Sequence, residues 1–193
     1  GVRRAMRARR AGFCGVGLAV MLAVAVCAAE PTVAVGVARI DITPELPIRL
    51  SGYQSRPAEA TRVEAPMTAR ALAIGSDADG PVVIVTAEVI AVSEAISEAV
   101  AAAVRVKHPA VTRERIAVCA THQHTGPAIA GTIPFMFSRD LPVDEQARID
   151  RYTAKLQEKL IAVALAALAD RKPARLAWAQ GKTDFAVNRR LIV

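Results

Sequence analysis

Aromatic residues are scarce in this sequence, at 4% of its 193 residues. This scarcity argues against a platform for single-stranded nucleic acid, because such platforms stack bases on aromatic side chains. The apolar fraction is 53% and consists largely of alanine and valine. This composition suits helices layered on a sheet, and the length is sufficient for one ordinary domain.

Cysteines are also few, and their positions exclude a disulfide framework. Cys14 and Cys27 lie within the first 29 residues, so Cys119 is alone in the rest of the chain. One cysteine cannot form an internal disulfide. We expect Cys119 to be a small apolar core residue in a strand rather than a nucleophile.

Acidic residues are absent before Glu30, and this absence accounts for most of the net charge of +7. Five of the 25 Lys and Arg residues lie in the first ten positions. Without residues 1–29, 20 basic and 18 acidic residues remain. The basic excess belongs mainly to this leader, which excludes a nucleic acid as the partner of the remaining chain.

Residues 1–29 have the order of a secretory signal peptide. A basic stretch is followed by an apolar run over residues 15–26 and then by Cys27, Ala28 and Ala29. We expect cleavage after Ala28 or Ala29, with export to the periplasm or the extracellular space. The apolar run is short for a membrane span, which needs about 20 residues. An uncleaved anchor and lipidation at Cys27 are the alternatives.

Hydrophobic patterning predicts an α/β fold, with a layered mixed sheet and packed helices. Asp79-Gly80 predicts a hairpin turn, Ser93 a helix N-cap, and Pro109 the end of that helix. The continuously apolar second strand of the hairpin predicts burial on both faces. The predicted elements are a strand over 33–43, hairpin strands over 69–76 and 81–88, a helix over 94–107, a strand over 115–120, a helix over 144–170 and a strand over 173–180.

The last predicted helix has a clear core-facing stripe. Apolar residues recur in it every three or four positions, as expected for a helix that packs on a sheet. The stripe consists of Ile149, Tyr152, Leu156, Leu160, Ala164 and Leu168. The chain begins with Gly1 rather than Met and stops within an apolar run, so we expect a fragment of a longer polypeptide and an incomplete domain.

Two of the three histidines, His122 and His124, follow a predicted strand directly. In extended backbone, positions i and i+2 face the same way, so we expect the two imidazoles to converge. Neutral imidazole is a preferred zinc ligand, and a catalytic zinc takes three protein ligands plus water. The pair indicates either a metal site or two polar histidines hydrogen-bonded at a strand end. His108, at a helix end, is expected to be solvated.

Other candidates for the site are weaker. Glu88 and Asp41 could bind a metal or support its ligands, but hydrogen-bonded or solvated acids at strand ends are commoner. The sequence contains neither Gly-x-Ser-x-Gly nor Gly-x-x-x-x-Gly-Lys, so serine-nucleophile and phosphate-loop chemistry lack support. Residues 51–53 (SGY) form a loop element to which the sequence assigns no mechanism.

Four sequence blocks follow one another in this order: 37–44 (VARIDITP), 51–53 (SGY), 69–72 (ARAL) and 120–127 (ATHQHTGP). As an ordered set they resemble the N-terminal part of neutral/alkaline non-lysosomal ceramidases. The resemblance spans about residues 33–193, so 30–193 is expected to be the N-terminal part of such a catalytic domain. It implies a Zn²⁺-dependent amidase that hydrolyses the N-acyl bond of ceramide to a fatty acid and sphingosine. It also implies a lipid amide substrate and peripheral membrane contact.

The resemblance assigns roles to individual residues. It implies that His122 binds zinc and that His124 assists catalysis. It places Arg189 near the polar group of the substrate, where a guanidinium can stabilise an oxyanion; a solvated surface arginine is the alternative. Gln123 departs from the family's block, which has threonine or a similar small residue there. The remaining zinc ligands (a histidine, a glutamate and a tyrosine) lie further along in the family, so the 193 residues alone are expected to be inactive.

Two other hypotheses stay open at this point. A barrel-type His-x-His metal hydrolase would require strands and helices to alternate regularly from the first strand onward. A non-catalytic secreted domain would keep the fold and lack the downstream ligands.

Overall fold

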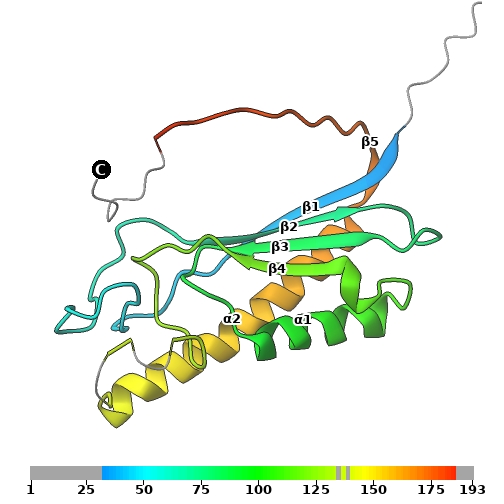
Figure 1. The fold of residues 1–193 in the computed structure, drawn as a ribbon. Helices are drawn as coiled ribbons and strands as arrows, with labels where there is room; N and C mark the ends of the chain where they lie inside the picture. Colours follow the sequence, from blue (N-terminus) through cyan, green and yellow to red (C-terminus); the bar gives the residue numbers. More distant parts are fainter. Residues whose placement is uncertain (1–31, 134–135, 138–139, 186–193) are drawn as a thin grey trace, which may run out of the picture. The chain divides into compact units, whose positions relative to one another are not determined.

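The chain folds around a five-stranded mixed sheet with the strand order β4-β3-β2-β1-β5 (Figure 1). The computed structural model describes residues 32–133, 136–137 and 140–185. The predicted signal peptide, with Cys14 and Cys27, therefore lies outside the described residues. The strands are β1 (Val33–Asp41), β2 (Thr68–Ile74), β3 (Val82–Ala87), β4 (Ile116–Ala120) and β5 (Lys172–Ala174).

Most neighbouring strands are antiparallel. β1 pairs antiparallel with both β2 and β5, and β2 pairs antiparallel with β3. The predicted hairpin is confirmed, and Gly80 in its turn has a φ of 69°, which glycine adopts without strain. Among the described strands, only β3 and β4 are parallel, and a helical crossover joins them. This part of the chain therefore lacks the regular alternation that the barrel hypothesis requires.

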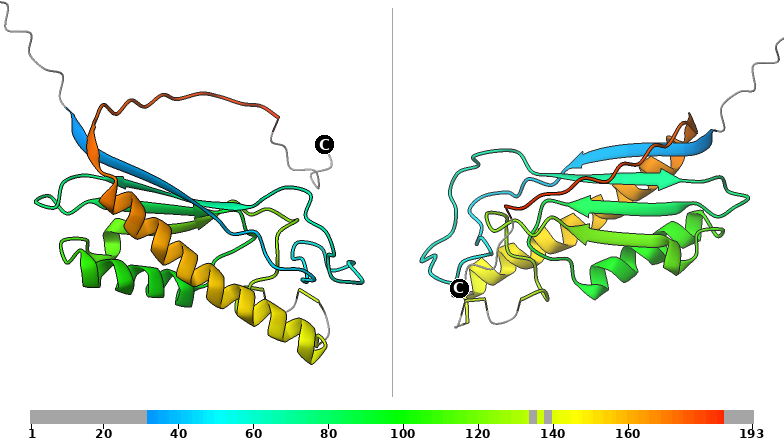
Figure 2. Two further views of the ribbon diagram at one scale, coloured as in Figure 1. Left: turned by 180° about the vertical axis from the view of Figure 1, so that it is seen from behind. Right: turned by 45° about the horizontal axis from the view of Figure 1, so that its top comes forward.

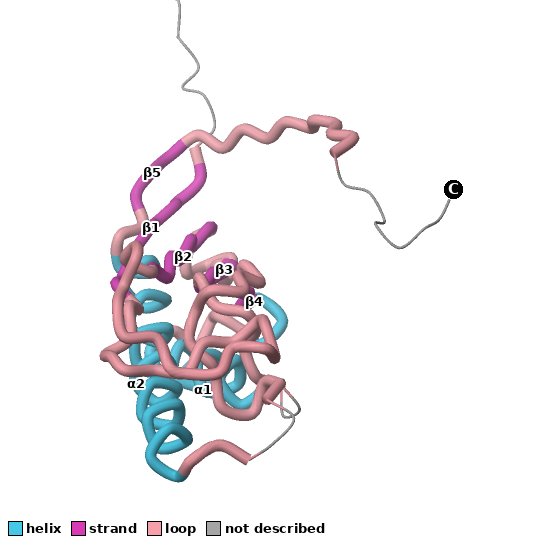
Figure 3. Tube along the Cα trace, turned by 90° about the vertical axis from the view of Figure 1, so that its left-hand side faces the viewer, coloured by secondary structure: helices cyan, strands magenta, loops and turns pink. Residues whose placement is uncertain are grey.

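Two helices, α1 (Glu94–Lys107) and α2 (Val143–Ala169), lie on the same face of the sheet (Figures 2 and 3). The predicted N-cap is confirmed, because Ser93 Oγ accepts a hydrogen bond from the amide of Ile96 at 3.3 Å. Every residue of the predicted stripe on α2 is buried. The predicted mixed sheet with packed helices is therefore confirmed. Among the described residues, no helix is both long and apolar enough to cross a membrane.

Strand β1 approaches α2 so closely that only glycine fits at the crossing. A Cβ atom on Gly36 would lie 2.0 Å from the carbonyl oxygen of Ala167. Just beyond this point, the amide of Val37 donates to a carboxylate oxygen of Asp170 at 3.1 Å. The end of α2 is therefore held against the backbone of β1.

The last strand is shorter than predicted. The sequence predicts a strand over 173–180, whereas β5 ends at Ala174. Ala174 pairs with Val33, the first residue of β1, so the following residues meet no further strand in the described chain. Trp178, within the predicted strand, is 90% exposed.

Two burial predictions are wrong for the described part of the chain. Strand β3 was expected to be buried on both faces, yet Val82 is 37% exposed and Ile84 is half-buried. Cys119 was expected in the core, yet it is exposed. Both errors have one cause. The described helices cover a single face of the sheet (Figure 3), and strand alternation with the β3–β4 register places these residues on the other face.

Candidate functional site

The histidine segment follows β4 at one edge of the sheet. Because β3 and β4 are parallel, the residues that follow each strand meet at that edge. The amide of Thr121 donates to the carbonyl oxygen of Ala87 at 3.0 Å, which ties the start of the segment to the end of β3. The two loops that follow β3 and β4 therefore form the candidate site together.

His122 is held in an orientation that suits a metal ligand. Its Nδ1 atom lies 2.9 Å from the carbonyl oxygen of Ile90. A carbonyl oxygen can only accept, so Nδ1 carries the proton and Nε2 keeps its lone pair free. Histidines that bind metals usually donate their second nitrogen in this way, which fixes the ring and its tautomer. The side chain is exposed, so its free nitrogen is accessible.

The two imidazoles lie close together, with ring centroids 5.0 Å apart and an angle of 75° between their planes. The proximity predicted from the sequence is present, but the reason given for it is wrong. His122 has a φ of 58°, in the left-handed region, so the backbone is not extended across the pair. A turn after the strand, rather than strand alternation, brings the rings together. A non-glycine residue in this conformation is uncommon and often marks a functional site.

The loop containing residues 51–53 packs directly on the histidine segment. The amide of Ser51 donates to the carbonyl oxygen of Gly126 at 3.0 Å, and the Ser51 hydroxyl donates to the same oxygen at 3.2 Å. Gly52 has a φ of 99°, and its backbone touches that of His124. The Tyr53 ring and the His124 imidazole are in T-shaped contact, with centroids 5.4 Å apart and an angle of 71° between their planes. Sequence reasoning missed this contact, for which the glycine was the only local signal.

The two candidate acids are engaged in hydrogen bonds. The Glu88 carboxylate accepts from the amide of Thr68 at 2.7 Å and from the guanidinium of Arg70 at 3.0 Å. Burial raises the pKa of Glu88, but these two donors outweigh it and hold the pKa below its ordinary value. Asp41 accepts from the amide of Thr43 at 2.6 Å, and this bond lowers its pKa. Both acids fit the interpretation as hydrogen-bonded residues at strand ends.

Gln123 ties the histidine segment to the end of β3. Its Nε2 donates to the carbonyl oxygen of Glu88 at 2.6 Å. Gln123 also lines a cavity of about 460 Å³. The cavity is mostly apolar, with walls from residues 43–50 and 60–67, and neither His122 nor His124 lines it. It therefore borders the segment at Gln123, Thr125 and Pro127 without reaching either histidine ring.

The remaining predicted residues do not join this site in the described chain. His108 caps the C-terminal end of α1, which leads to the start of β4, whereas the histidine segment follows the end of β4. Asn188 and Arg189 lie outside the described residues. Within residues 32–133, 136–137 and 140–185, no group of three His, Cys, Asp or Glu side chains could hold a metal ion. The described site consists of one oriented imidazole, a second imidazole beside it, and the loops that fix them.

Comparisons with known proteins identify the family of this chain. The family model for the N-terminal part of neutral/alkaline non-lysosomal ceramidases matches residues 33–189. The crystal structure of neutral ceramidase from Pseudomonas aeruginosa is similar, with a TM-score of 0.57 and 22% identity over 75% of this chain and 23% of that one. A ceramidase complexed with C2 has a TM-score of 0.58 and 22% identity, over 74% of this chain and 22% of that one.

This chain thus spans less than a quarter of the length of either solved structure. No curated protein matches it. Structural likeness at this identity shows the fold alone, whereas the family model covers most of the sequence. The chain belongs to the neutral/alkaline non-lysosomal ceramidase family.

Proposed function

We propose that the full-length protein hydrolyses the N-acyl amide bond of a ceramide-like lipid and uses zinc to do so. The observation that carries the proposal is the hydrogen bond from His122 Nδ1 to Ile90, which leaves Nε2 exposed and free. Membership of the ceramidase family supports the choice of an amide substrate.

In this proposal His122 binds zinc through Nε2, and its other ligands come from outside the described residues. Zinc, when bound, would polarise the amide carbonyl and lower the pKa of a water molecule enough for attack near neutral pH. Two histidines cannot complete a catalytic zinc site, which takes three protein ligands. The 193 residues alone are therefore expected to be inactive.

His124 would transfer a proton during the reaction. Its ring centroid lies 5.0 Å from that of His122, so a substrate held at a zinc ion on His122 would also lie near His124. Imidazole suits this role because its ordinary pKa lies close to neutrality. We assign Arg189, outside the described residues, to stabilisation of the oxyanion that develops on the amide.

We further propose that residues 1–29 direct export, so that the protein meets its lipid substrate outside the cytoplasm and at a membrane surface. The basic, apolar and small-residue order of this leader supports the proposal. N-terminal sequencing of the exported protein tests it. A first residue at Ala29 or Glu30 is expected, and an intact leader would contradict it.

The experiment for the reaction uses the full-length protein, its His122→Ala variant and a matched His108→Ala control. We expect zinc content to fall in the first variant and to stay unchanged in the control, because His108 lies before the start of β4 and the histidine segment after its end. Equal zinc in all three proteins would contradict the proposed ligand.

Release of fatty acid from ceramide, compared with simpler N-acyl amides, tests the substrate. We expect hydrolysis of ceramide, and at least a hundredfold loss in the His122→Ala variant. If the full-length protein hydrolyses neither class of amide, the chain belongs to a non-catalytic secreted domain and the proposed function is wrong.

A further inference from the structure

Arg49 is the largest fully buried side chain in the described part of the chain, with 2% of its surface exposed. A buried guanidinium is costly unless it is paired and hydrogen-bonded. Its Nε and Nη2 atoms lie 3.0 and 2.8 Å from a carboxylate oxygen of Glu145, in the first turn of α2. Its Nη1 atom donates to the carbonyl oxygen of Arg56 at 3.2 Å. This buried charge therefore joins the loop after β1 to α2.

The backbone at the same position is bonded to the histidine segment. The carbonyl oxygen of Arg49 accepts from the amide of Ala128 at 2.8 Å. The next residue, Leu50, forms an antiparallel bridge with Pro127. One residue thus contacts α2 with its side chain and the segment that follows His124 with its main chain.

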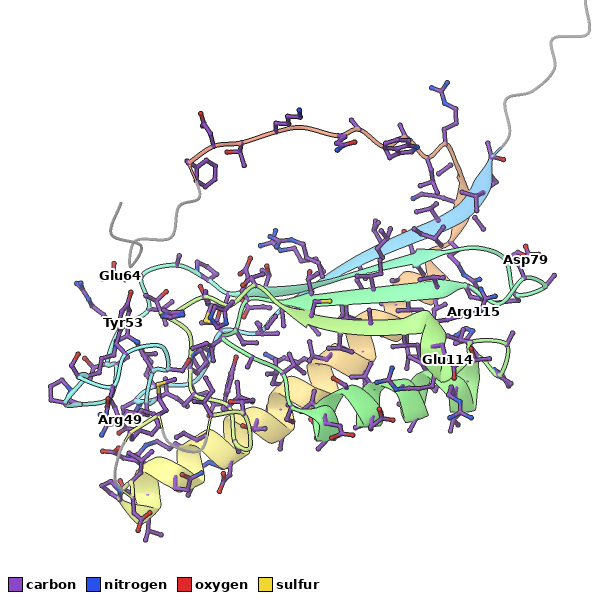
Figure 4. The ribbon with its side chains drawn as sticks, in the orientation of Figure 1. Arg49, Tyr53, Glu64, Asp79, Glu114 and Arg115 are labelled. Atoms are coloured by element: carbon purple, nitrogen blue, oxygen red, sulfur yellow. The ribbon has the colours of Figure 1, made fainter. Side chains whose placement is uncertain are left out.

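Arg56 carries this connection to the site. Its guanidinium donates to the carbonyl oxygen of Ser51, and its Cζ atom lies 4.9 Å from the centroid of the Tyr53 ring. The Tyr53 ring is in turn in T-shaped contact with the His124 imidazole. Tyr53 is 54% exposed, so few other contacts hold its ring. Figure 4 shows Arg49 and Tyr53 at the same end of the sheet, far from Asp79 and Arg115.

We propose that the ion pair between Arg49 and Glu145 positions the His124 imidazole, acting through Arg56 and Tyr53. Arg49 is a positioning residue, since it touches neither histidine. The catalytic part of this inference rests on the proposed function, because it takes His124 to act in the reaction. The geometric part does not depend on any activity.

The test compares Arg49→Met and Tyr53→Leu with a matched control, Arg148→Met, in the full-length protein. Arg148, on α2, also ties the same loop to that helix through Glu59 at 2.7 Å, and it pairs with Asp144 on its own helix at 2.8 Å. Among the described residues, its hydrogen bonds go to Glu59 and Asp144 and not to Arg56 or Tyr53. A general loosening of the loop should therefore affect all three variants, whereas loss of positioning should affect only the first two.

The first measurement is the rate at which diethylpyrocarbonate modifies His124, read by mass spectrometry relative to His108 in the same molecule. We expect the ratio of the His124 rate to the His108 rate to rise severalfold in both variants. Tyr53→Leu removes the ring that contacts His124, and Arg49→Met removes the ion pair that holds that ring in place. The ratio should stay at the wild-type value in Arg148→Met. Equal ratios in Arg49→Met and Arg148→Met would overturn the proposal.

The second measurement is amide hydrolysis. A displacement of about 1 Å can cost about a hundredfold in rate, so we expect kcat to fall about 10- to 100-fold in Arg49→Met and Tyr53→Leu. Zinc content and KM should change less than about twofold. The double variant should be no slower than Arg49→Met alone, because both substitutions interrupt one connection. If the losses in kcat of the two single variants multiply in the double variant, the proposal is overturned.

Tyr53→Leu keeps the test decisive if Arg49→Met does not fold, because Tyr53 is half exposed and its replacement leaves the buried pair intact. An unchanged His124 ratio and unchanged kcat in Tyr53→Leu would overturn the proposal. If the wild-type protein hydrolyses no amide while the His124 ratio responds as expected, the proposed function fails and the positioning role stands.

Discussion

A Cβ atom on Gly52 would lie 2.5 Å from the Cβ atom of His124. The backbone of one loop is therefore in direct contact with the backbone of the other, with no side chain between them. Because Gly52 also has a φ of 99°, two independent features require glycine at this position.

We predict that Gly52→Ala destabilises the protein more than Gly131→Ala does. Gly131 also has a positive φ, 75°, but nothing lies within 4 Å of its added Cβ atom. The control should cost about 1 to 2 kcal/mol for the left-handed backbone. Gly52→Ala should cost a further 1 to 3 kcal/mol or so for the clash. Urea unfolding measures both free energies of unfolding. Equal losses in the two variants would contradict a close contact between the Gly52 and His124 loops.

A second prediction concerns the crossing of β1 and α2. Gly36→Ala places a methyl group 2.0 Å from the carbonyl oxygen of Ala167, and backbone cannot move aside as a side chain can. We expect a loss of about 1 to 3 kcal/mol in the free energy of unfolding. Gly181→Ala is the control, because nothing lies within 4 Å of its added Cβ atom. A thermal midpoint for Gly36→Ala equal to that of the control would contradict the close approach.

A third prediction concerns the cap of α1. Ser93→Ala removes the oxygen that accepts from the amide of Ile96, and the loss should be about 1 kcal/mol. Ser93→Asp keeps a side-chain oxygen at the helix N-terminus and should restore most of that stability. Thermal unfolding of both variants provides the measurement. No difference between alanine and aspartate would mean that the cap contributes nothing.

A fourth prediction is a dependence of stability on pH through Glu88. The pKa of Glu88 is held below its ordinary value of 4.5 in the folded protein. A carboxyl with a depressed folded pKa stabilises the fold above its unfolded pKa, and this stabilisation is lost as pH falls through the folded pKa. Glu88→Gln should therefore cost about 1 to 2 kcal/mol at pH 7. The difference in unfolding free energy between Glu88→Gln and wild type should shrink below pH 4.5. If this difference is the same at all pH values, the pKa of Glu88 is not lowered in the folded protein.

The sequence predicted what depends on local pattern. The stripe on α2, the Ser93 cap and the hairpin turn at Gly80 each follow from residues within a few positions of one another. Their geometry is set by helix periodicity, by one side-chain oxygen and by backbone freedom. These features are confirmed in the described part of the chain.

The site itself was predicted less well, because it is built from distant segments. No local pattern reports that Ser51 bonds to Gly126, 75 residues later. The left-handed backbone of His122 was also missed, since strand alternation was extended past the end of β4. Cys119 was misplaced because an apolar run does not tell which face of a strand is covered. Zinc binding by His122, the role of Arg189 and the signal peptide stay predictions.

The pairing of Arg49 with Glu145 has a consequence for how the protein is made. The two residues are 96 positions apart in the sequence. Ribosomes add about 5 to 20 residues per second, so Arg49 leaves the synthesis site about 5 to 20 s before its partner is added. During that interval its charge stays in water, and the loop that contacts His124 lacks its anchor. The candidate site can thus assemble only after the first turn of α2 has been synthesised.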